Sequence, residues 1–414
     1  MRTWPPYNRR LLPEKSQMNR ALLTILATVV LSAVGIGLTM PIIPQLMRDV
    51  GHTSELGWRF GAFTGLYALM QFIFSPILGV LSDRIGRRPV LLLSLAGAVV
   101  DYLFMAMAPT LALLFVGRAI AGITGASMAV TSAYIADVTP EDQRSRRYGQ
   151  LGACFGIGFI IGPVIGGLLG EWWVRAPFLA AAAMNAVNLV LTLLVVRESH
   201  AARASDAGAT GRMSFNPLTN LRWAAGFKSL LPLIGASGLL VVIGEIGGTV
   251  WVLYGEDKFA WDSLTIGISL ACFGAFHALA QAFIVGPIAE RWGERRALMV
   301  GIAADSCAYV LIALANQGWM AFALMPLFCL GGIGAPALQS LVSASVGPDQ
   351  QGKLQGVLAS TASLATVIGP VAISTIYFMS RGSFPGLVWL IGAGLYVFCL
   401  PVLMRKPEVP SAAS

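Results

Sequence analysis

Long apolar runs separated by short polar stretches dominate the chain. Twelve such runs can be counted, and a run of about 20 residues is long enough to cross the roughly 30 Å hydrocarbon core of a bilayer as an α-helix. The pattern therefore predicts an all-α membrane protein with twelve transmembrane helices. The expected spans are 21–44, 58–81, 90–108, 112–135, 148–169, 177–196, 230–254, 265–289, 297–315, 320–342, 354–379 and 387–404.

The overall composition agrees with this pattern. Of the 414 residues 56% are hydrophobic and only 12% are charged, against about 25% charged residues in ordinary soluble domains. The mean hydropathy is +0.73. These values exclude a soluble protein of two or three domains. The five cysteines are scattered and all lie within expected spans, so neither disulfide bonds nor a cysteine metal site is expected.

Basic residues are distributed unevenly among the segments that connect the spans. If both termini are cytoplasmic, 22 of the 28 Lys and Arg residues lie in cytoplasmic segments, and Arg118 lies inside a span. By the positive-inside rule, this bias predicts that both termini are cytoplasmic. Because topology accounts for the net charge of +8, nucleic acid is not expected as a partner. The opposite loops hold only Arg48, Arg59, Arg175, Lys258 and Arg381.

The chain repeats itself at an offset of 207 residues. That offset aligns Gly79 with Gly286, and it carries Gly162–Pro163 onto Gly369–Pro370. One offset that holds across several spans predicts two pseudo-symmetric six-helix halves, related by an axis along the membrane normal. The expected parts are a basic cytoplasmic tail at 1–20, a first bundle at 21–196, a cytoplasmic linker at 197–229, a second bundle at 230–404 and a cytoplasmic tail at 405–414.

A charged motif, Gly79-Val-Leu-Ser-Asp-Arg-Ile-Gly-Arg-Arg-Pro89, lies between the second and third spans. Asp83 can accept hydrogen bonds from the first N–H groups of the next helix and from arginine, so the cluster could latch one conformation. The alternative is that the arginines only set the topology. Topology needs neither an aspartate nor fixed glycines, which favours a gating role for Asp83, Arg84, Arg87 and Arg88.

The fifth span has glycines at every fourth position: Gly158, Gly162, Gly166 and Gly170. Such a small-residue stripe lets another helix approach closely. Pro163 interrupts the hydrogen-bond ladder of the span and permits a bend. Close packing alone would explain the glycines, but the proline among them favours a helix that both seals and moves, with Gly162 and Pro163 as gating residues.

Five ionisable residues lie inside expected spans, where an ionised side chain costs about 2.5–3.5 kcal/mol and therefore needs a partner, water or a function. Asp305 sits near the middle of its span. A carboxyl there can hold a proton when dry and release it when the cavity opens to water. The alternative for Asp305 is a structural acid paired with an amide or an arginine. The proton-coupling candidates are Asp305, Asp101, His277, Glu245 and Arg118.

For each of the other four candidates, the sequence leaves an alternative to a role in proton coupling. Asp101 lies either on a proton path or in a structural pair, and Arg118 either lowers the pKa of an acid such as Asp101 or snorkels to the interface. Glu245 either handles protons or cations or is a water-exposed acid near the mouth. His277 and Gln281 are four residues apart on one helix face, which could present an imidazole and an amide to a cavity.

Uncharged polar side chains within the spans are candidates for substrate recognition, although a polar side chain in a helix bundle is as often an interhelical contact. Tyr67 and Gln71 are again four residues apart. Together with His277 and Gln281, the substrate-binding candidates are Gln71, Tyr67, Asn185, Asn188 and Gln339.

Two of these motifs carry a resemblance. Gly79-x-Leu-Ser-Asp-Arg-x-Gly-Arg-Arg88 resembles the loop signature of the major facilitator superfamily, and Gly158-x-x-x-Gly-Pro-x-x-Gly-Gly167 is similar to the fifth-helix motif of its drug/proton antiporters. The runs GIGLTMPIIP, YALMQFIFSP, WVLYGEDKF and HALAQAF resemble those of tetracycline efflux pumps. The resemblance implies the major facilitator fold, alternating access, and proton-coupled efflux of an amphipathic drug, first of all a tetracycline as its divalent-metal chelate.

The chain departs from those pumps at two positions. They usually carry aspartate where this chain has Ser32, and glutamine where it has Glu245. One acid is thus absent from the first half and one is added to the second. The alternative function is a proton-coupled transporter of a different small molecule.

An enzyme is not expected, because the three histidines are far apart and no nucleophile–base pair or metal cluster is evident. No metal site or cofactor is expected beyond the proton gradient and a Mg ion carried with the substrate. The expected partners are a small-molecule substrate, protons and the lipid bilayer. The expected form is a monomer in the bacterial inner membrane.

Overall fold

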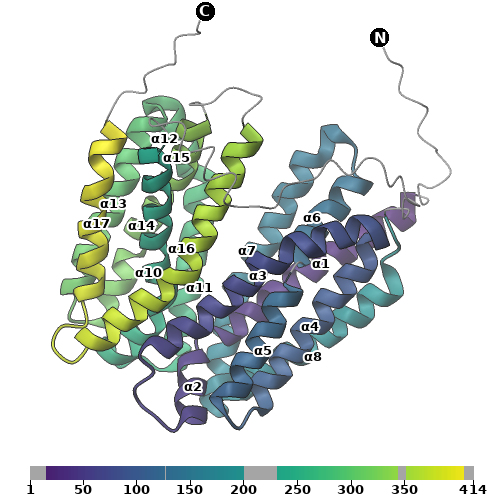
Figure 1. Ribbon diagram of the computed structural model, residues 1–414, viewed down its shortest axis with the longest axis horizontal. Helices are drawn as coiled ribbons and strands as arrows, with labels where there is room; N and C mark the ends of the chain where they lie inside the picture. Colours follow the sequence, from purple (N-terminus) through teal and green to yellow (C-terminus); the bar gives the residue numbers. More distant parts are fainter. Residues whose placement is uncertain (1–14, 126, 200–230, 344–350, 405–414) are drawn as a thin grey trace, which may run out of the picture.

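The computed structural model describes residues 15–125, 127–199, 231–343 and 351–404, and within them every regular element is a helix. The predicted linker and both predicted tails lie largely outside these residues. The helices form two bundles (Figure 1). The first contains α1 (Lys15–Thr39), α2 (Ile43–Gly51), α3 (Trp58–Ile85), α4 (Arg87–Met107), α5 (Leu111–Thr124), α6 (Ser127–Val138), α7 (Glu141–Trp172) and α8 (Ala176–Val195).

The second bundle repeats the order of the spans, but α10 is continuous over the positions that correspond to α2 and most of α1. One π-helical turn, η2 (Gln281–Val285), interrupts its second span. The bundle contains α10 (Leu231–Phe259), α11 (Ser263–Ala280), α12 (Gly286–Trp292), α13 (Glu294–Leu314), α14 (Gly318–Gly331), α15 (Gly334–Ser343), α16 (Gln351–Ser380) and α17 (Leu387–Met404).

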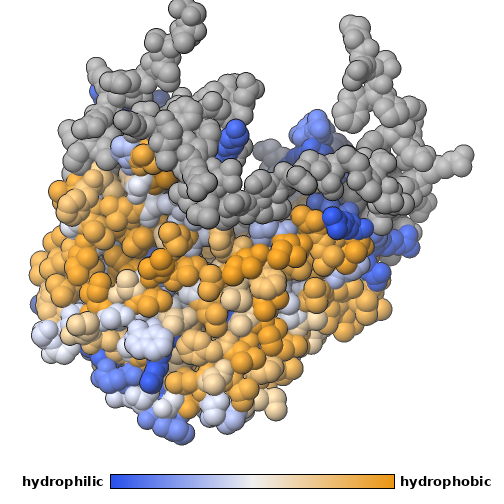
Figure 2. Space-filling model, in the orientation of Figure 1, coloured by the Kyte–Doolittle hydropathy of each residue, from blue (hydrophilic) through white to orange (hydrophobic). Residues whose placement is uncertain are grey.

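The expected spans are present as helices. Ten helical segments of the described chain are long and apolar enough to cross a membrane, and two shorter apolar helices, Gly318–Gly331 and Leu387–Cys399, coincide with the other two expected spans. A broad hydrophobic band runs across both bundles on the face shown in Figure 2, and hydrophilic side chains gather near α2. The prediction of an all-α, multi-pass membrane protein is confirmed.

The 207-residue repeat extends to helix boundaries. The bounds of α4 and α5 shifted by 207 residues are those of α13 and α14. The glycines that precede α4 and α13 also correspond: Gly86 has a φ of 106° and Gly293 a φ of 77°. Because side chains rarely adopt a positive φ, glycine is favoured at both positions. The two halves therefore share local geometry as well as sequence.

Two expected spans are broken in the structure. The span predicted at 112–135 divides into α5 and α6, and the span predicted at 320–342 divides into α14 and α15. The sequence at the second break, Gly331-Gly-Ile-Gly334, is rich in the residue that least favours a helix interior after proline. Hydropathy alone could not show these breaks, because glycine does not interrupt an apolar run.

The halves meet near the end of the molecule that carries α2 and diverge toward the opposite end (Figure 1). Helix α3 lies against α16, where a Cβ added to Gly65 would be 2.6 Å from the Val367 carbonyl oxygen. Helix α7 lies against α11, where a Cβ on Gly167 would be 2.8 Å from Leu264 Cα. Backbones therefore meet directly at both crossings, as glycine permits.

Helix α7 also packs closely on α1. A Cβ on Gly158 would lie 2.7 Å from the Val30 carbonyl oxygen, and one on Gly162 would lie 2.7 Å from that of Val34. The contacts advance by four residues on both helices, as expected for a stripe of small residues. The predicted close approach at the fifth span is confirmed, with α1 on one side of α7 and α11 on another.

Candidate functional site

A cavity of about 150 Å³ lies within the first half, among α1, α3, α4, α5 and α8. Asp101 on α4 lines it and is buried, with 3% of the residue exposed. Its Oδ2 lies 3.6 Å from Arg118 Nη1 on α5. Arg118 also lies over two aromatic rings, with its Cζ 5.2 Å from the centroid of Phe63 and 4.9 Å from that of Tyr67. Arg118 therefore lies within ion-pair distance of Asp101.

The pair is incompletely satisfied. Asp101 Oδ1 and Arg118 Nε are buried without a hydrogen-bond partner among the described residues. A buried polar atom without a partner is costly. The two opposite charges balance, but one hydrogen-bond acceptor, Asp101 Oδ1, and one donor, Arg118 Nε, have no described partner.

The predicted polar side chains of the first half divide into two groups. Tyr67 and Asn185 line the cavity beside Ser32. Gln71 Nε2 instead donates to the Gly125 carbonyl oxygen at 2.9 Å. Asn188 is buried and donates to the Thr28 carbonyl oxygen at 3.3 Å, joining α8 to α1. Gln71 and Asn188 are therefore interhelical contacts in this conformation.

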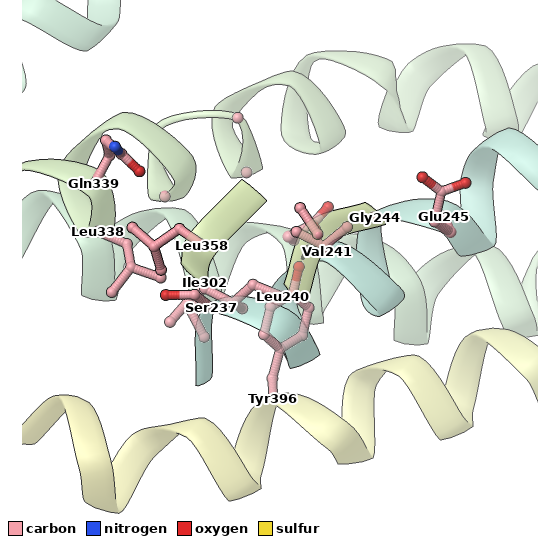
Figure 3. A pocket seen from close by; sticks show the side chains of 15 residues that line it. Ser237, Leu240, Val241, Gly244, Glu245, Ile302, Leu338, Gln339, Leu358 and Tyr396 are labelled. Carbon is pink, nitrogen blue, oxygen red and sulfur yellow. Dashed lines mark hydrogen bonds between the residues drawn. The ribbon is translucent and has the colours of Figure 1, made fainter. Parts of the chain in front are cut away.

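A larger cavity of about 480 Å³ lies within the second half, lined by α10, α13, α15, α16 and α17 and by the break after α14. Asp305 and Glu245 both line it. The Tyr396 hydroxyl donates a hydrogen bond to Asp305 Oδ2. In Figure 3, Tyr396 reaches toward the cavity from α17, and Glu245 and Gln339 lie at its opposite ends. Gln339 Nε2 donates to Gln355 Oε1 at 2.7 Å.

The glycines of the helix break separate Asp305 from His277. A Cβ on Gly331 would lie 2.6 Å from Asp305 Cγ, and one on Gly332 would lie 2.9 Å from His277 Cε1. His277 does not line the cavity; its ring stacks on Phe273, with centroids 5.9 Å apart. Gln281 is exposed, with its Nε2 3.5 Å from the Gly332 carbonyl oxygen. His277 and Gln281 share a helix face, because the Gln281 N–H donates to the His277 carbonyl oxygen, but neither residue lines the cavity.

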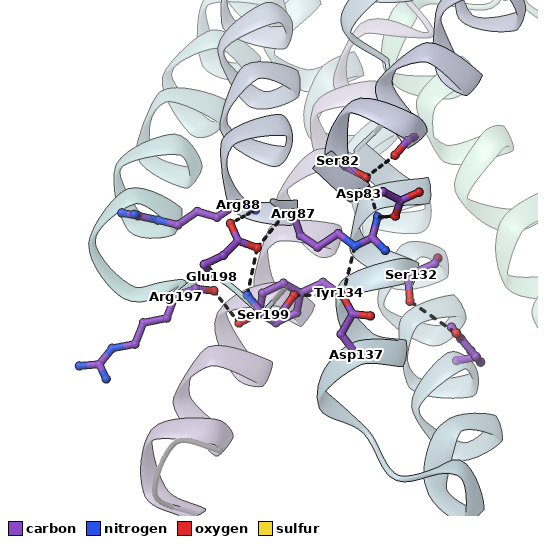
Figure 4. Close-up of polar contacts among 12 residues, drawn as sticks. Ser82, Asp83, Arg87, Arg88, Ser132, Tyr134, Asp137, Arg197, Glu198 and Ser199 are labelled. Carbon is purple, nitrogen blue, oxygen red and sulfur yellow. Dashed lines mark hydrogen bonds and ion pairs between the residues drawn. The ribbon is translucent and has the colours of Figure 1, made fainter. Parts of the chain in front are cut away.

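The charged loop motif forms a network within the first half (Figure 4). Arg87 lies between two acids: its Nη1 is 2.6 Å from Asp83 Oδ1, and its Nε is 3.1 Å from Asp137 Oδ2. Arg88 Nη2 donates to the Leu193 carbonyl oxygen at 2.6 Å. For Arg84, the remaining predicted gating arginine, the described contacts include no ion pair.

The sequence interpretation missed three partners in these sites. The N–H groups of Arg87 and Arg88 donate to Glu198, at 2.7 and 3.1 Å, so Glu198 rather than Asp83 accepts hydrogen bonds at the start of α4. Asp137 and Tyr396 were also not singled out. Asp137 and Glu198 could have been found as acidic residues next to the ends of predicted spans. Tyr396 could not, because a tyrosine within an apolar run does not stand out.

Comparisons with known proteins agree with this architecture. Residues 25–244 and 234–414 match the Major Facilitator Superfamily. A nucleoside transporter structure, NupG, superimposes with a TM-score of 0.77 at 16% identity, covering 93% of this chain and 100% of that chain, which supports the fold alone.

Curated relatives are more similar in sequence. The chain is 49% identical to the class C tetracycline resistance protein of Escherichia coli, over 94% of this chain and 97% of that protein. It is 41% identical to the class B tetracycline resistance protein of Escherichia coli, over 95% of this chain and 98% of that protein. The chain belongs to the major facilitator superfamily and, within it, to the family of tetracycline resistance proteins.

Proposed function

We propose that this protein exports a tetracycline across the membrane in exchange for protons. The observation that carries the proposal is the 49% identity to a tetracycline resistance protein over nearly the full length of both chains. Two cavities, one in each half, and halves that meet at one end only support a transporter that works by alternating access. The identity to tetracycline resistance proteins favours a tetracycline over the alternative of a different small molecule.

The proposed orientation places both termini in the cytoplasm, as the distribution of Lys and Arg predicts. The end that carries α2 then faces away from the cytoplasm, and the described conformation is open toward the cytoplasm. The protein acts as a monomer in the bacterial inner membrane. It needs no bound cofactor, and the drug travels as a Mg chelate, so the metal arrives and leaves with the substrate.

Asp305 is proposed as the principal proton carrier. It lines the larger cavity, and its described partner is a neutral hydroxyl rather than a base. A carboxyl in this setting can exchange a proton each time water reaches the cavity. Asp101, paired with Arg118, is a second and more strongly held acid.

The charged network around Arg87 and the bend at Pro163 are proposed as gating elements. In this conformation, the described ion pairs of the network all lie within the first half. The network can therefore act as a latch only if the opposite conformation brings the second half against Asp83 or Arg84.

Inverted membrane vesicles test the transport reaction. With an established pH gradient, addition of tetracycline and Mg should dissipate part of the gradient, and Asp305→Asn should abolish that response at unchanged membrane expression. A tetracycline susceptibility panel in a pump-deficient bacterium gives the direction of transport. Vesicles that respond to no tetracycline would rule out the proposed substrate, and an active Asp305→Asn variant would make Asp305 a structural acid.

A further inference from the structure

The two cavities occupy corresponding positions in the two halves. The 207-residue offset carries Leu95 of the first cavity onto Ile302 of the second, and Ala98 onto Asp305. Residues beside the two helix breaks also correspond and contribute to the two linings: Thr124, Gly125 and Ser127 in the first, and Gly331, Gly332 and Gly334 in the second. The cavities therefore overlap at corresponding positions around the helix break, but the first extends toward α3 and α5 and the second toward α10 and α16.

Their charges differ. The first cavity contains one acid, Asp101, with its counter-ion Arg118. The second contains two acids, Asp305 and Glu245, and no Lys, Arg or His is among its lining residues. Among the described residues, no salt bridge includes either Asp305 or Glu245. The second cavity thus has two carboxyl groups without a basic partner, whereas the acid of the first cavity has one.

The two acids have different surroundings. Asp305 accepts the hydrogen bond of the Tyr396 hydroxyl. Glu245 lies against α16 beside Gly369, where its Cγ would be 3.7 Å from an added Cβ. The nearby Thr366 hydroxyl donates to the Ala362 carbonyl oxygen at 3.0 Å. The Thr366 hydroxyl also lies within hydrogen-bond reach of Glu245, so each of the two acids has one hydroxyl neighbour and no basic partner among its described contacts.

The remaining lining suits an amphipathic ligand. Ser237, Gln339 and Tyr396 add polar atoms, and leucine, isoleucine and valine side chains supply apolar surface. A volume of about 480 Å³ lies within the range of about 300–1,000 Å³ of small-molecule sites. An apolar chamber with uncompensated carboxylates at membrane depth favours a ligand that brings its own positive charge.

We infer that the cavity of the second half binds amphipathic organic cations, with Glu245 as the carboxylate that selects for positive charge. Such cations carry a permanent positive charge without a bound metal ion or an added proton. They therefore form a substrate class separate from metal chelates. The inference rests on the proposed function only in assuming that a ligand of this cavity is exported.

Binding of tetraphenylphosphonium, a permanently charged monovalent cation, tests the inference without any transport step. Radiolabelled tetraphenylphosphonium should bind the purified full-length protein saturably, whereas neutral triphenylphosphine oxide should not displace it. Glu245→Gln should weaken binding by about tenfold or more, equivalent to about 1.4 kcal/mol. Glu245→Asp should retain most of the affinity, because the charge remains.

Glu141→Gln is the matched control, because it removes the same charge from a side chain that is 89% exposed outside the cavity. It should bind tetraphenylphosphonium as the parent protein does. Absence of saturable binding, or equal binding by Glu245→Gln and the parent, would overturn the inference.

A tetracycline assay on the same preparations separates the two proposals. Tetracycline efflux without tetraphenylphosphonium binding would refute the cation site and leave the proposed function intact. Saturable, Glu245-dependent binding without tetracycline efflux would refute the proposed function and leave the cation site intact.

Discussion

Among single residues, Arg118 has a structural role that can be measured apart from transport. Its guanidinium lies 3.6 Å from Asp101, whose side chain is 4% exposed. Removing one partner of a buried ion pair typically costs about 3–5 kcal/mol, because the remaining charge is left unpaired. We expect Arg118→Leu to lower the free energy of unfolding by a large part of this amount, as measured by thermal unfolding of the purified protein.

Arg144 provides the control for that experiment. Its ion pair with Glu141 has nearly the same length, 3.5 Å, but the two side chains are 41% and 89% exposed. Arg144→Leu should therefore change stability by no more than about 1 kcal/mol. Asp101→Asn in the Arg118→Leu background should restore part of the loss. Equal destabilisation by the two arginine variants would contradict the role of burial.

The sequence could single out the charged residues of both cavities, because an ionisable side chain stands out in an apolar run. It offered Asp101 as one possible partner of Arg118 but could not decide that pairing, and it gave no sign that Tyr396 is the described partner of Asp305, since tertiary packing decides which helices lie side by side. His277 shows the same limit: helical spacing gave its face, but not the position of the cavity behind Gly332.

Among the helices, α7 carries a direct test of close backbone contact between the halves. A Cβ on Gly167 would lie 2.8 Å from Leu264 Cα on α11, whereas one on Gly156 of the same helix would have nothing within 4 Å. Overpacking typically costs about 1–3 kcal/mol. Here it would destabilise the conformation in which the two halves are in contact at the α2 end. We expect Gly167→Ala to reduce tetracycline efflux by about tenfold and Gly156→Ala to leave it unchanged. Similar efflux rates for both variants would refute the steric argument.

The first turn of α11 provides a pH-dependent test. Asp262 Oδ1 accepts a hydrogen bond from the Thr265 N–H at 2.7 Å, and hydrogen bonding to Thr265 lowers the pKa of Asp262. A carboxylate whose pKa is lower in the folded than in the unfolded protein stabilises the fold at pH values above its unfolded-state pKa of about 3.9. This stabilisation is lost as the pH falls through the folded-state pKa. Below about pH 4, Asp262→Asn should therefore lose less stability than the parent protein in unfolding experiments.

Asp262→Ala removes the cap altogether and should cost about 1 kcal/mol at neutral pH. The side chain is largely exposed, so solvent screens its charge and the pH-dependent part should be a fraction of that cost. Parallel loss of stability by the parent and the Asn variant below pH 4 would show that the charge of Asp262 contributes nothing.

At the scale of helices, hydropathy and the repeat predicted which segments cross the membrane, because burial in lipid demands length and apolarity. They did not predict the breaks in the fourth and tenth spans or the π-helical turn η2. The break in the fourth span lines the first cavity, the break in the tenth span lines the second, and η2 begins four residues after His277. Backbone that leaves the α-helix is tolerated where it lines a cavity rather than lipid.

In the whole molecule, the 207-residue repeat accounts for the shared architecture of the two halves. It does not explain why the halves are in contact at the α2 end and apart at the other end. Backbone contact between the halves is found near α2, and there opposite charges also face each other across the interface. Arg48 of the first half pairs with Glu256 of the second. Arg381 of the second half lies 2.5 Å from Glu55 Oε1 of the first. Both pairs must break before this end can open.

We expect the combined variant Arg48→Gln, Arg381→Gln to open the α2 end more often. Partly exposed pairs contribute roughly 0.2–1 kcal/mol each, so loss of both should raise the open population by about two- to thirtyfold. A reporter is Ser374→Cys in a background without native cysteines, because Ser374 is fully buried where its Oγ accepts from the Gly61 N–H. The combined variant should label faster with maleimide. Arg175→Gln is the control, because the described hydrogen bonds of Arg175 go to the carbonyl oxygens of Ala106 and Ala108 in its own half. Equal labelling of the combined variant and the parent would show that the ion pairs do not hold this end closed.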